Sequence, residues 1–371
     1  MPRKVFYIIS DVEKAMGFEW IALGIDRRQV ALYFILMGKD NTPLVSFLKK
    51  ATIPHFVVPF YGKKDVPSAW IRVFSILLKE RPEVVHTHLF FANLIGLTTA
   101  WCLRVKRRIH TRHHASLHHQ YFPRSVFFDK VINFISTDII ALSENLQKIL
   151  IDWEGVGKSK VHLIPHGFHL SYFSERNGRR VDDVRKTHNV PATYPVVGLI
   201  ARFTKWKGIQ YVIPAFKELL KEYPQAHLIL ANATGDYTRE IRELLSRLPH
   251  GTYTTIPFEE DSASLYHLFD IYIHTPIDAY CEAFGQTYVE ALAAGVPSIF
   301  TLSGIACDFI EHRKNAWLVK YEDSTEIAHA LRVILGNVTL RNELVYNGKI
   351  SVQERFSIAD MLDKLNNLYC I

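Results

Sequence analysis

Short apolar runs alternate with longer amphipathic segments along the whole chain. The apolar runs, such as residues 5–9 and 196–200, have the length of buried strands, and the segments between them have room for helices. Strands separated by helix-length segments are typical of βαβ units, in which helices cover both faces of a parallel sheet. The pattern therefore predicts an α/β fold built from doubly wound parallel sheets.

The 371 residues are too many for one compact core, and they form two βα series. We predict one domain over residues 1–172 and a second over residues 195–350, with the charged residues 174–189 as a linker or peripheral segment. Two such domains in tandem would leave a cleft, the usual place for a ligand. The expected strands are 5–9, 30–37, 55–59, 84–88, 108–111, 138–142, 161–165, 196–200, 227–230, 252–256, 271–275, 298–302 and 316–319. The expected helices include 70–79, 93–104, 209–221, 239–248, 263–268, 287–294, the region from 324 onward, and 358–370.

The composition is that of a globular protein, with 48% hydrophobic and 22% charged residues. The 4 cysteines have no paired spacing, so they predict neither a disulfide framework nor a zinc site and suit a reduced compartment. The apolar stretches at 69–78 and 90–103 are too short or too interrupted to span a bilayer, and residues 4–10 suit a first strand better than a signal peptide. We therefore expect a cytoplasmic location.

Positive charge is concentrated in the first half of the chain. Residues 1–170 hold 23 Lys and Arg against 13 Asp and Glu, a balance of +10, whereas the remainder holds 21 against 24. A basic half indicates an anionic partner such as a membrane surface, a phospholipid-linked substrate or a polyanion, although a solvated surface without a partner fits equally well. For a membrane partner, aromatic side chains near Trp70, Phe90 and Phe127 would face the lipid at the inner face of the membrane. We expect no nucleic-acid partner.

Two carboxylates, Glu282 and Glu290, lie in a segment that ends in Gly295 and Pro297. The residues before Gly295 favour a helix, so Glu290 is predicted inside it and Glu282 in the loop before it. Eight residues of continuous helix span about 12 Å and about 80° of rotation, whereas glycosidase carboxylates lie about 5–9.5 Å apart, so a hydrolytic pair is the weaker interpretation. With Glu282 in the loop, both can flank a ligand at the helix N-terminus, where phosphate is favoured. The plain alternative is a solvated helix residue and a loop charge.

A basic loop follows the expected strand 196–200 and contains Arg202 and Lys207. Cations at the carboxyl end of a strand, in a βα turn, are well placed to clamp a diphosphate. Arg202 offers a bidentate fork and Lys207 a point charge. On its own such a loop is more often simply solvated, but an anion-ready helix terminus later in the same domain favours the binding interpretation.

Histidines are dense in the first domain, and residues 104–119 alone hold five of the 18 in the chain. Zinc could bind such a cluster, but the spacing supplies no carboxylate or cysteine partner and no helical pair with an intervening Glu. We therefore predict no metal site. A loop that faces an anion, with one histidine reaching the ligand, fits the pattern better. His86 and His88 at another strand end could line the cleft, although packed histidines are commoner there.

Three pieces in the second half together resemble the family 4 retaining glycosyltransferases: Arg202 with Lys207 and Gly208, the Tyr266-x-x-Phe269-Asp270-Ile271 run, and the segment from Glu282 to Pro297. Each piece is common alone, but the ordered set is specific. The resemblance is dense over residues 196–318, looser over 84–173 and only architectural before that. It implies the GT-B fold, in which two Rossmann-like domains face each other across a cleft and a C-terminal helix, here within 351–371, returns to the first domain.

The resemblance also implies roles for the two carboxylates and the two cations. Arg202 and Lys207 would contact the diphosphate of a nucleotide-sugar donor and stabilise the leaving nucleotide. Glu290 would hold the ribose hydroxyls, and Glu282 would face the donor sugar. No metal ion or cofactor is implied, because the two cations supply the positive charge.

Backbone groups and one histidine complete the implied site. The N–H groups of Phe284, Gly285 and Gln286 would hold sugar and phosphate oxygens. His113 would lie near the donor sugar as a catalytic residue, with His114 as its close rival. The chain departs from the family where it has only Gly17 in the first βα loop, His166-Gly167 in place of Asn-Gly, and Asn315-Ala316 in place of a second Asn-Gly.

The resemblance implies a retaining, metal-independent hexosyltransferase. It would move a sugar from a UDP- or GDP-linked donor to a hydroxyl of a glycan or lipid-linked acceptor, as in cell-surface polysaccharide or glycolipid synthesis. A sugar-nucleotide epimerase or a phosphorylase would share the two-domain cleft and is the first alternative. A non-catalytic nucleotide-sugar sensor, or a module that binds anionic surfaces, is the alternative of another class.

Overall fold

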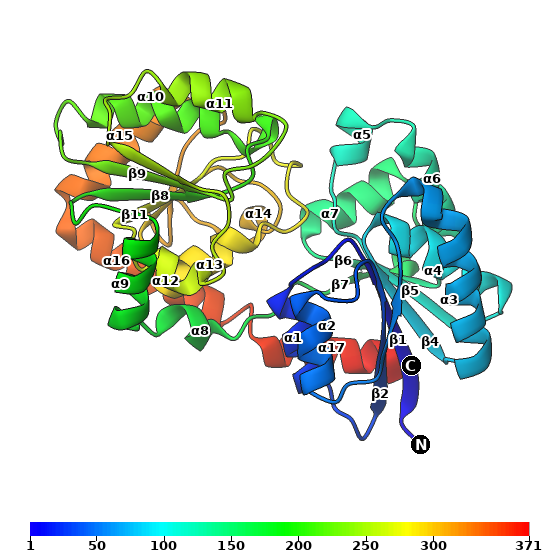
Figure 1. Ribbon diagram of the computed structural model, residues 1–371. Helices are drawn as coiled ribbons and strands as arrows, with labels where there is room; N and C mark the ends of the chain where they lie inside the picture. The colour runs from blue at the N-terminus through cyan, green and yellow to red at the C-terminus, as the bar shows by residue number, and fades with distance from the viewer. Residues whose placement is uncertain (371) are drawn as a thin grey trace. The chain divides into compact units, whose positions relative to one another are not determined.

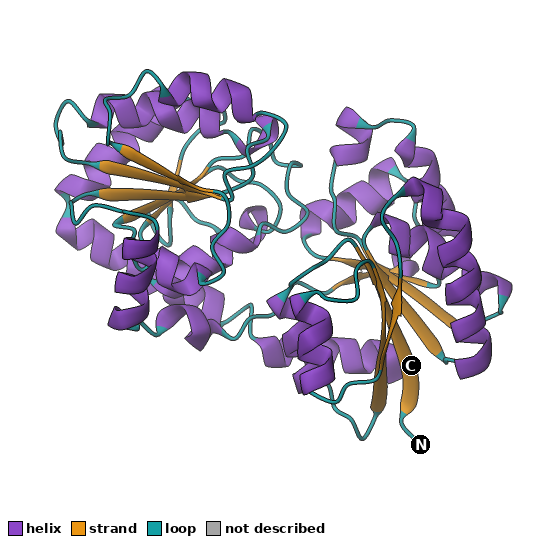
Figure 2. Ribbon diagram, in the orientation of Figure 1, coloured by secondary structure: helices purple, strands orange, loops and turns teal. Residues whose placement is uncertain are grey.

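The computed structural model describes residues 1–370 and separates them into two compact units (Figure 1). Unit 1 comprises Met1–Phe168 together with the C-terminal segment that begins at Ile358, and unit 2 comprises His169–Ser357. The charged segment 174–189 lies within unit 2, where helix α9 (Gly178–Thr187) packs against helix α12 (Ser262–Tyr266). In both units a sheet lies between layers of helices (Figure 2).

Unit 1 contains a seven-stranded parallel sheet in the order β3-β2-β1-β4-β5-β6-β7. Each strand lies within two residues of its predicted bounds, and most of them are short apolar runs that the sheet buries, although β4 and β5 also carry polar residues. The strands are β1 (Arg3–Ser10), β2 (Val30–Met37), β3 (His55–Val58), β4 (Val84–His88), β5 (Arg107–Thr111), β6 (Asp138–Ala141) and β7 (Val161–Leu163). The helices are α1 (Met16–Gly24), α2 (Pro43–Lys50), α3 (Val66–Glu80), α4 (Phe90–Cys102), α5 (Leu117–Tyr121), α6 (Ser125–Ile135), α7 (Glu144–Lys148) and α17 (Ile358–Cys370), with shorter turns η1 (Lys63–Asp65), η2 (Ile149–Trp153) and η3 (Lys158–Lys160).

Alternate residues of β1 pack against helices on opposite faces of this sheet. Phe6 and Ile8 join the core formed with α3 and α4. Tyr7 points the other way, and its hydroxyl hydrogen-bonds to the hydroxyl of Tyr369 on α17. The same Tyr369 hydroxyl lies 2.7 Å from Nδ1 of His86 on β4, so the last helix is tied to the centre of the sheet of unit 1.

Unit 2 contains a six-stranded parallel sheet in the order β10-β9-β8-β11-β12-β13, with α10 and α11 on one face and α12 and α13 on the other (Figure 1). The α/β prediction of doubly wound parallel sheets is thus confirmed in both units. The strands are β8 (Val196–Ile200), β9 (His227–Ala231), β10 (Tyr253–Ile256), β11 (Ile271–His274), β12 (Ser298–Phe300) and β13 (Trp317–Leu318). The remaining elements are α8 (Leu170–Ser174), η4 (Lys205–Lys207), α10 (Ile209–Leu219), α11 (Thr238–Leu245), α13 (Gln286–Ala294), α14 (Ala306–Phe309), α15 (Ser324–Gly336) and α16 (Val338–Gln353).

The helices of residues 1–370 are all too short or too polar to cross a bilayer. Of the three aromatic positions expected to be exposed, only Phe127 is, on α6. Phe90 is half-buried, and so is Trp70, whose indole N–H donates to the Thr98 hydroxyl at 3.0 Å. The expectation was wrong for Trp70 because α3 packs against α4, and for Phe90 because its ring packs against those of Phe91, His118 and Phe128.

Candidate functional site

The predicted site residues of unit 2 follow β8 and β11, which are neighbours at the centre of its sheet. From β8 the chain continues to β9 on one side, whereas β11 leads to β12 on the other. The strand order therefore reverses between β8 and β11. In doubly wound sheets, the crevice at the carboxyl ends of two such strands is where ligands bind.

The loop after β8 is shaped by Gly208. This residue has a φ of 73°, and a Cβ atom there would collide with the backbone carbonyl of Thr275 at the end of β11. Only glycine allows this approach. The loop after β11 is held to the same turn, because the N–H of Ile277 donates to the carbonyl of Trp206 at 3.1 Å. The two loops are therefore joined to each other at the place where the strand order reverses.

Lys207 and Glu282 form an ion pair across these two loops. The same carboxylate oxygen, Oε1, lies 3.0 Å from Nε2 of His274, the last residue of β11. The backbone N–H of Glu282 donates to the Ser303 hydroxyl at 3.1 Å. Glu282 is only 8% exposed, so Lys207 and His274 hold a buried carboxylate while Ser303 holds the backbone of the same residue.

The electrostatics keep Glu282 ionised. Burial by itself raises the pKa of Glu282, but the Lys207 ammonium and the His274 hydrogen bond outweigh burial, and the pKa lies well below its ordinary value. Burial also lowers the pKa of His274, although Glu282 partly offsets this effect. A neutral His274 can therefore donate from Nε2 to the carboxylate.

Helix α13 begins directly after the Glu282 loop, as predicted. Gly285 occupies its N-cap with a φ of 87°, and Gly295 ends it with a φ of 75°. Gly285 offers no side chain to cap the first N–H groups, so the helix dipole and these donors remain suited to an anion. Phe284 is buried with its ring against Phe356, while its carbonyl accepts from Ile305 at 2.9 Å.

Glu290 lies inside α13, as predicted, and is only 9% exposed. Its Oε2 accepts a hydrogen bond of 2.9 Å from the hydroxyl of Tyr266 on α12. Burial raises the pKa of Glu290 to about 7, and the Tyr266 hydrogen bond only partly opposes it. Glu290 is therefore poised to change its charge near neutral pH, unlike Glu282.

Arg202 and Gln286 are placed differently from the buried carboxylates. Arg202 is exposed, and its guanidinium forms no ion pair with any residue of the described chain 1–370. Gln286 is the exposed first residue of α13. A cation held by a structured loop but left unpaired is available to a ligand, whereas Lys207 is already engaged with Glu282.

His113 lies in unit 1, in the loop after β5. Its Nε2 is 3.1 Å from Nδ1 of His88 at the end of β4, and its ring stacks on that of His166 after β7 with centroids 5.8 Å apart. Burial and the neighbouring His166 lower the pKa of His113. Histidines that follow three strands thus meet as neutral rings at the carboxyl edge of this sheet.

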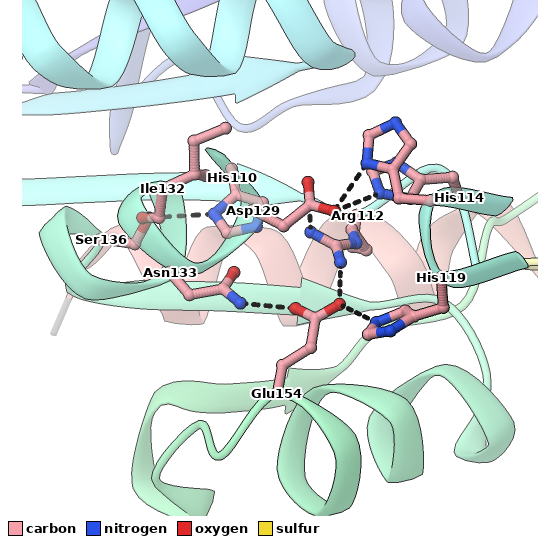
Figure 3. Close-up of polar contacts among 10 residues, drawn as sticks. His110, Arg112, His114, His119, Asp129, Ile132, Asn133, Ser136 and Glu154 are labelled. Carbon is pink, nitrogen blue, oxygen red and sulfur yellow. Dashed lines mark hydrogen bonds and ion pairs between the residues drawn. The ribbon is translucent and has the colours of Figure 1, made fainter. Parts of the chain in front are cut away.

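His114, the predicted rival, belongs to another cluster (Figure 3). Its Nε2 lies 3.2 Å from Oδ2 of Asp129 on α6. The buried Arg112 guanidinium connects Asp129 to Glu154, at 3.1 Å from Oδ1 of Asp129. Burial and Arg112 lower the pKa of His114 to about 4. The engagement of His114 with Asp129 leaves His113 as the candidate among the strand-end histidines.

The sequence interpretation missed the partners of Glu282 and Glu290. His274 and Ser303 contact Glu282, and Tyr266 contacts Glu290. A histidine near the end of the predicted central strand 271–275 was a usable signal for His274. Tyr266 belongs to a motif that gives no indication of its contact with Glu290. No pattern in the sequence links Ser303 to Glu282.

Two family models match the chain. The model described as Glycosyl transferases group 1 matches residues 181–351, and that of Glycosyltransferase Family 4 matches residues 22–172. The chain is 24% identical over 308 residues to the capsular polysaccharide biosynthesis glycosyltransferase CapM of Staphylococcus aureus, which covers 81% of this chain and 79% of that protein. It is 24% identical over 267 residues to the alpha-monoglucosyldiacylglycerol synthase of Streptococcus pneumoniae, which covers 65% of this chain and 57% of that protein.

Solved structures resemble the whole chain. HepE of Anabaena, in complex with UDP and glucose, has a TM-score of 0.84 with 19% identity and covers 99% of each chain. WaaG, a glycosyltransferase involved in lipopolysaccharide biosynthesis, has a TM-score of 0.74 with 12% identity and covers 99% of each chain. At these identities the likeness shows the shared fold.

Proposed function

Since the chain belongs to the group 1 and family 4 glycosyltransferases, we propose that it transfers a hexose from a nucleoside diphosphate donor to an acceptor hydroxyl with retention of the anomeric configuration. The observation that carries the proposal is the set of groups at the β8/β11 edge. These are an exposed Arg202, a Lys207–Glu282 ion pair and a helix N-terminus without a side-chain cap.

Each group suits one part of the donor. The diphosphate lies against Arg202, Lys207 and the N–H groups of Gly285 and Gln286, where two cations and the α13 dipole offset its charge. When the diphosphate arrives, Lys207 is shared between it and Glu282. Glu282 is thereby freed to accept hydrogen bonds from the sugar hydroxyls.

The base end of the donor lies further along α13. Ribose hydroxyls donate to the Glu290 carboxylate, which Tyr266 already orients from the other side. Because an ionised carboxylate only accepts hydrogen bonds, this contact requires Glu290 to lose its proton. UDP is the nucleotide we propose first, supported by the UDP and glucose bound in the HepE complex.

The reaction breaks the bond between the anomeric carbon and the diphosphate oxygen and forms a bond from the same carbon to the acceptor oxygen. The acceptor attacks on the face that the leaving group departs from, through an oxocarbenium-like transition state, and its proton passes to the leaving phosphate. Arg202 and Lys207 stabilise the charge that develops on the diphosphate, so the reaction needs no metal ion. His113 is the proposed catalytic residue of unit 1.

The acceptor is proposed to be a glycan or a lipid-linked sugar at the inner face of a membrane. Phe127, Lys130 and Phe134 follow one another at helical spacing on α6, and the two phenylalanines are 67% and 78% exposed. Aromatic rings beside a cation suit the interface of an anionic bilayer. Flotation with anionic vesicles at low salt tests this, with Phe127→Ser/Phe134→Ser expected to lose binding and Ile71→Ser on α3 to keep it. Equal flotation of both variants would contradict it.

A ligand panel followed by product analysis tests the main proposal. UDP, GDP and ADP with their sugars are compared by the rise in melting temperature that a ligand of the folded state causes. The bound donor is then incubated with candidate acceptors. Free nucleotide together with a glycosylated acceptor supports the transferase, whereas an epimerised donor, phosphate-dependent cleavage or binding without turnover would support the epimerase, phosphorylase or sensor instead.

A further inference from the structure

A second polar cluster in unit 1 lies outside the proposed donor site. It joins His114 in the loop after β5, His118 on α5 and Asp129 on α6. Nε2 of His114 is 3.2 Å and Nδ1 of His118 is 2.6 Å from the same oxygen, Oδ2 of Asp129. The three candidate ligand atoms all lie within 4.8 Å of one another.

These distances suit a divalent metal ion. Zinc binds histidine nitrogen and carboxylate oxygen at about 2.0–2.2 Å, and a tetrahedral arrangement then separates its ligand atoms by about 3.3 Å. Small movements of the two imidazole rings bring the group to that spacing. Two histidines and one carboxylate leave the fourth position to water; zinc sites with three protein ligands of this kind and one water are known, mostly in catalytic centres.

Asp129 is oriented as a metal ligand requires. Its Oδ1 forms an ion pair with the buried Arg112 guanidinium at 3.1 Å (Figure 3), and its Oδ2 is the oxygen that both histidines contact. Groups that fix a coordinating carboxylate in this way are typical of metal sites. Arg112 also binds Glu154, so one guanidinium faces two buried carboxylates. The negative charge of the two carboxylates is therefore not fully balanced by the guanidinium, so an added cation would be stabilised.

The site is accessible to an ion and would serve a local purpose. The side chains of His114 and His118 are 16% and 11% exposed. Helix α5 has five residues and no side-chain cap, so it has little stability of its own. An ion bound here would fix α5 between α6 and the loop that carries His113.

We propose that His114, His118 and Asp129 form a binding site for a divalent cation of the zinc class, which fastens α5 to the core of unit 1. The sequence did not predict it because Asp129 is 15 residues from His114 and only the folded chain brings them together. The proposal stands independently of glycosyl transfer, since the ion is structural.

The test uses untagged full-length protein, stripped with a chelator and titrated with Zn²⁺ or Co²⁺. We expect one tightly bound ion per chain by calorimetry, the visible absorption of Co²⁺ with nitrogen and oxygen ligands, and a rise in melting temperature with Zn²⁺. His114→Gln/His118→Gln should lose all three responses. His119→Gln is the matched control, because His119 contacts Glu154 in the neighbouring network at 3.1 Å and is not a proposed ligand.

Two outcomes would overturn the site. One is a wild-type protein that gives no calorimetric signal and no Co²⁺ absorption, which would leave the cluster a hydrogen-bonded ion-pair network. The other is a double variant that binds the ion as tightly as the wild type, which would put the ion elsewhere. Asp129→Asn is the additional variant. Circular dichroism of the chelator-treated proteins identifies any loss of ion binding that arises from unfolding.

Discussion

The carboxyl edges of the two sheets hold their polar groups in opposite ways. At the β8/β11 edge of unit 2, the side chains are charged: Glu282 is ionised beside Lys207, and Arg202 is exposed. At the corresponding edge of unit 1, burial lowers the pKa of His88 and His113, so the meeting rings are neutral. The difference is that unit 2 presents charged side chains at this edge, whereas unit 1 presents uncharged imidazole rings.

The largest expected effect is the loss of the exposed cation at the charged edge. Arg202→Ala should lower turnover of the donor by about 10²–10³, because it removes stabilisation of the leaving diphosphate. The melting temperature should stay unchanged, since Arg202 forms no ion pair within residues 1–370. Nucleotide release from the donor measures the effect, and Lys205→Ala in the same loop is the control. Similar losses in both variants would remove the special role of Arg202.

Lys207 should behave differently from Arg202 because it neutralises a buried carboxylate. Lys207→Ala leaves Glu282 buried without its partner, so we expect a loss of stability of about 3 kcal/mol as well as a loss of turnover. The double variant Lys207→Ala/Glu282→Gln should recover much of the stability and none of the activity. Denaturant unfolding of the four proteins in this cycle measures the coupling. A stability loss that the double variant does not relieve would contradict the ion-pair account.

The carboxyl edge of the sheet of unit 1, with its neutral histidines, is tested through His113. His113→Ala should lower turnover by about 10² if this ring assists the reaction. His55→Ala is the control, because His55 is the first residue of β3, the outermost strand of the same sheet, and lies away from the carboxyl ends of β4 and β5. Turnover and melting temperature are measured together. Normal turnover in a folded His113→Ala protein would show that unit 1 contributes no catalytic histidine at this position.

Glu290 gives the charged edge a pH dependence. Its pKa is raised to about 7, so donor binding should strengthen as pH rises from about 6 to 8, when the carboxylate ionises and accepts the ribose hydroxyls. The unliganded protein should show the opposite trend, since a carboxyl with a raised folded-state pKa stabilises the fold at low pH and loses this effect as pH rises through 7. Tyr266→Phe should move the midpoint upward and weaken binding about tenfold.

Calorimetric titration with uridine measures the binding trend without interference from phosphate ionisation. Glu290→Gln is the reference, because it has no proton to lose and its binding should not vary with pH. A wild-type profile as flat as that of Glu290→Gln would contradict the assigned contact to ribose.

The smallest effect concerns the attachment of α17 to unit 1. Tyr369→Phe removes the hydroxyl that bonds Tyr7 and His86, so we expect a loss of about 1–2 kcal/mol in unfolding free energy. Thermal unfolding measures it, with Tyr346→Phe, an exposed tyrosine on α16, as the control. An unchanged melting temperature would mean that apolar packing alone holds this helix.

The sequence predicted the fold closely because each strand is a local signal. Residues 30–37 and 358–370 have their predicted bounds, since apolar periodicity alone specifies them. The Glu282 loop and α13 were also predictable, because a glycine precedes the helix and another ends it. In contrast, contacts such as Ser303 with Glu282, or Asp129 with His114, join segments whose proximity only the sheet order creates. No local pattern in the chain contains that information.

The central claim is that the β8/β11 edge of unit 2 binds the diphosphate of the donor. Calorimetric titration of UDP into wild-type, Arg202→Ala and Lys205→Ala proteins at low salt tests it most directly. The account predicts that Arg202→Ala weakens binding at least about tenfold, in line with a lost charge-assisted hydrogen bond, while Lys205→Ala binds like the wild type. Equal affinity of all three proteins for UDP would contradict it.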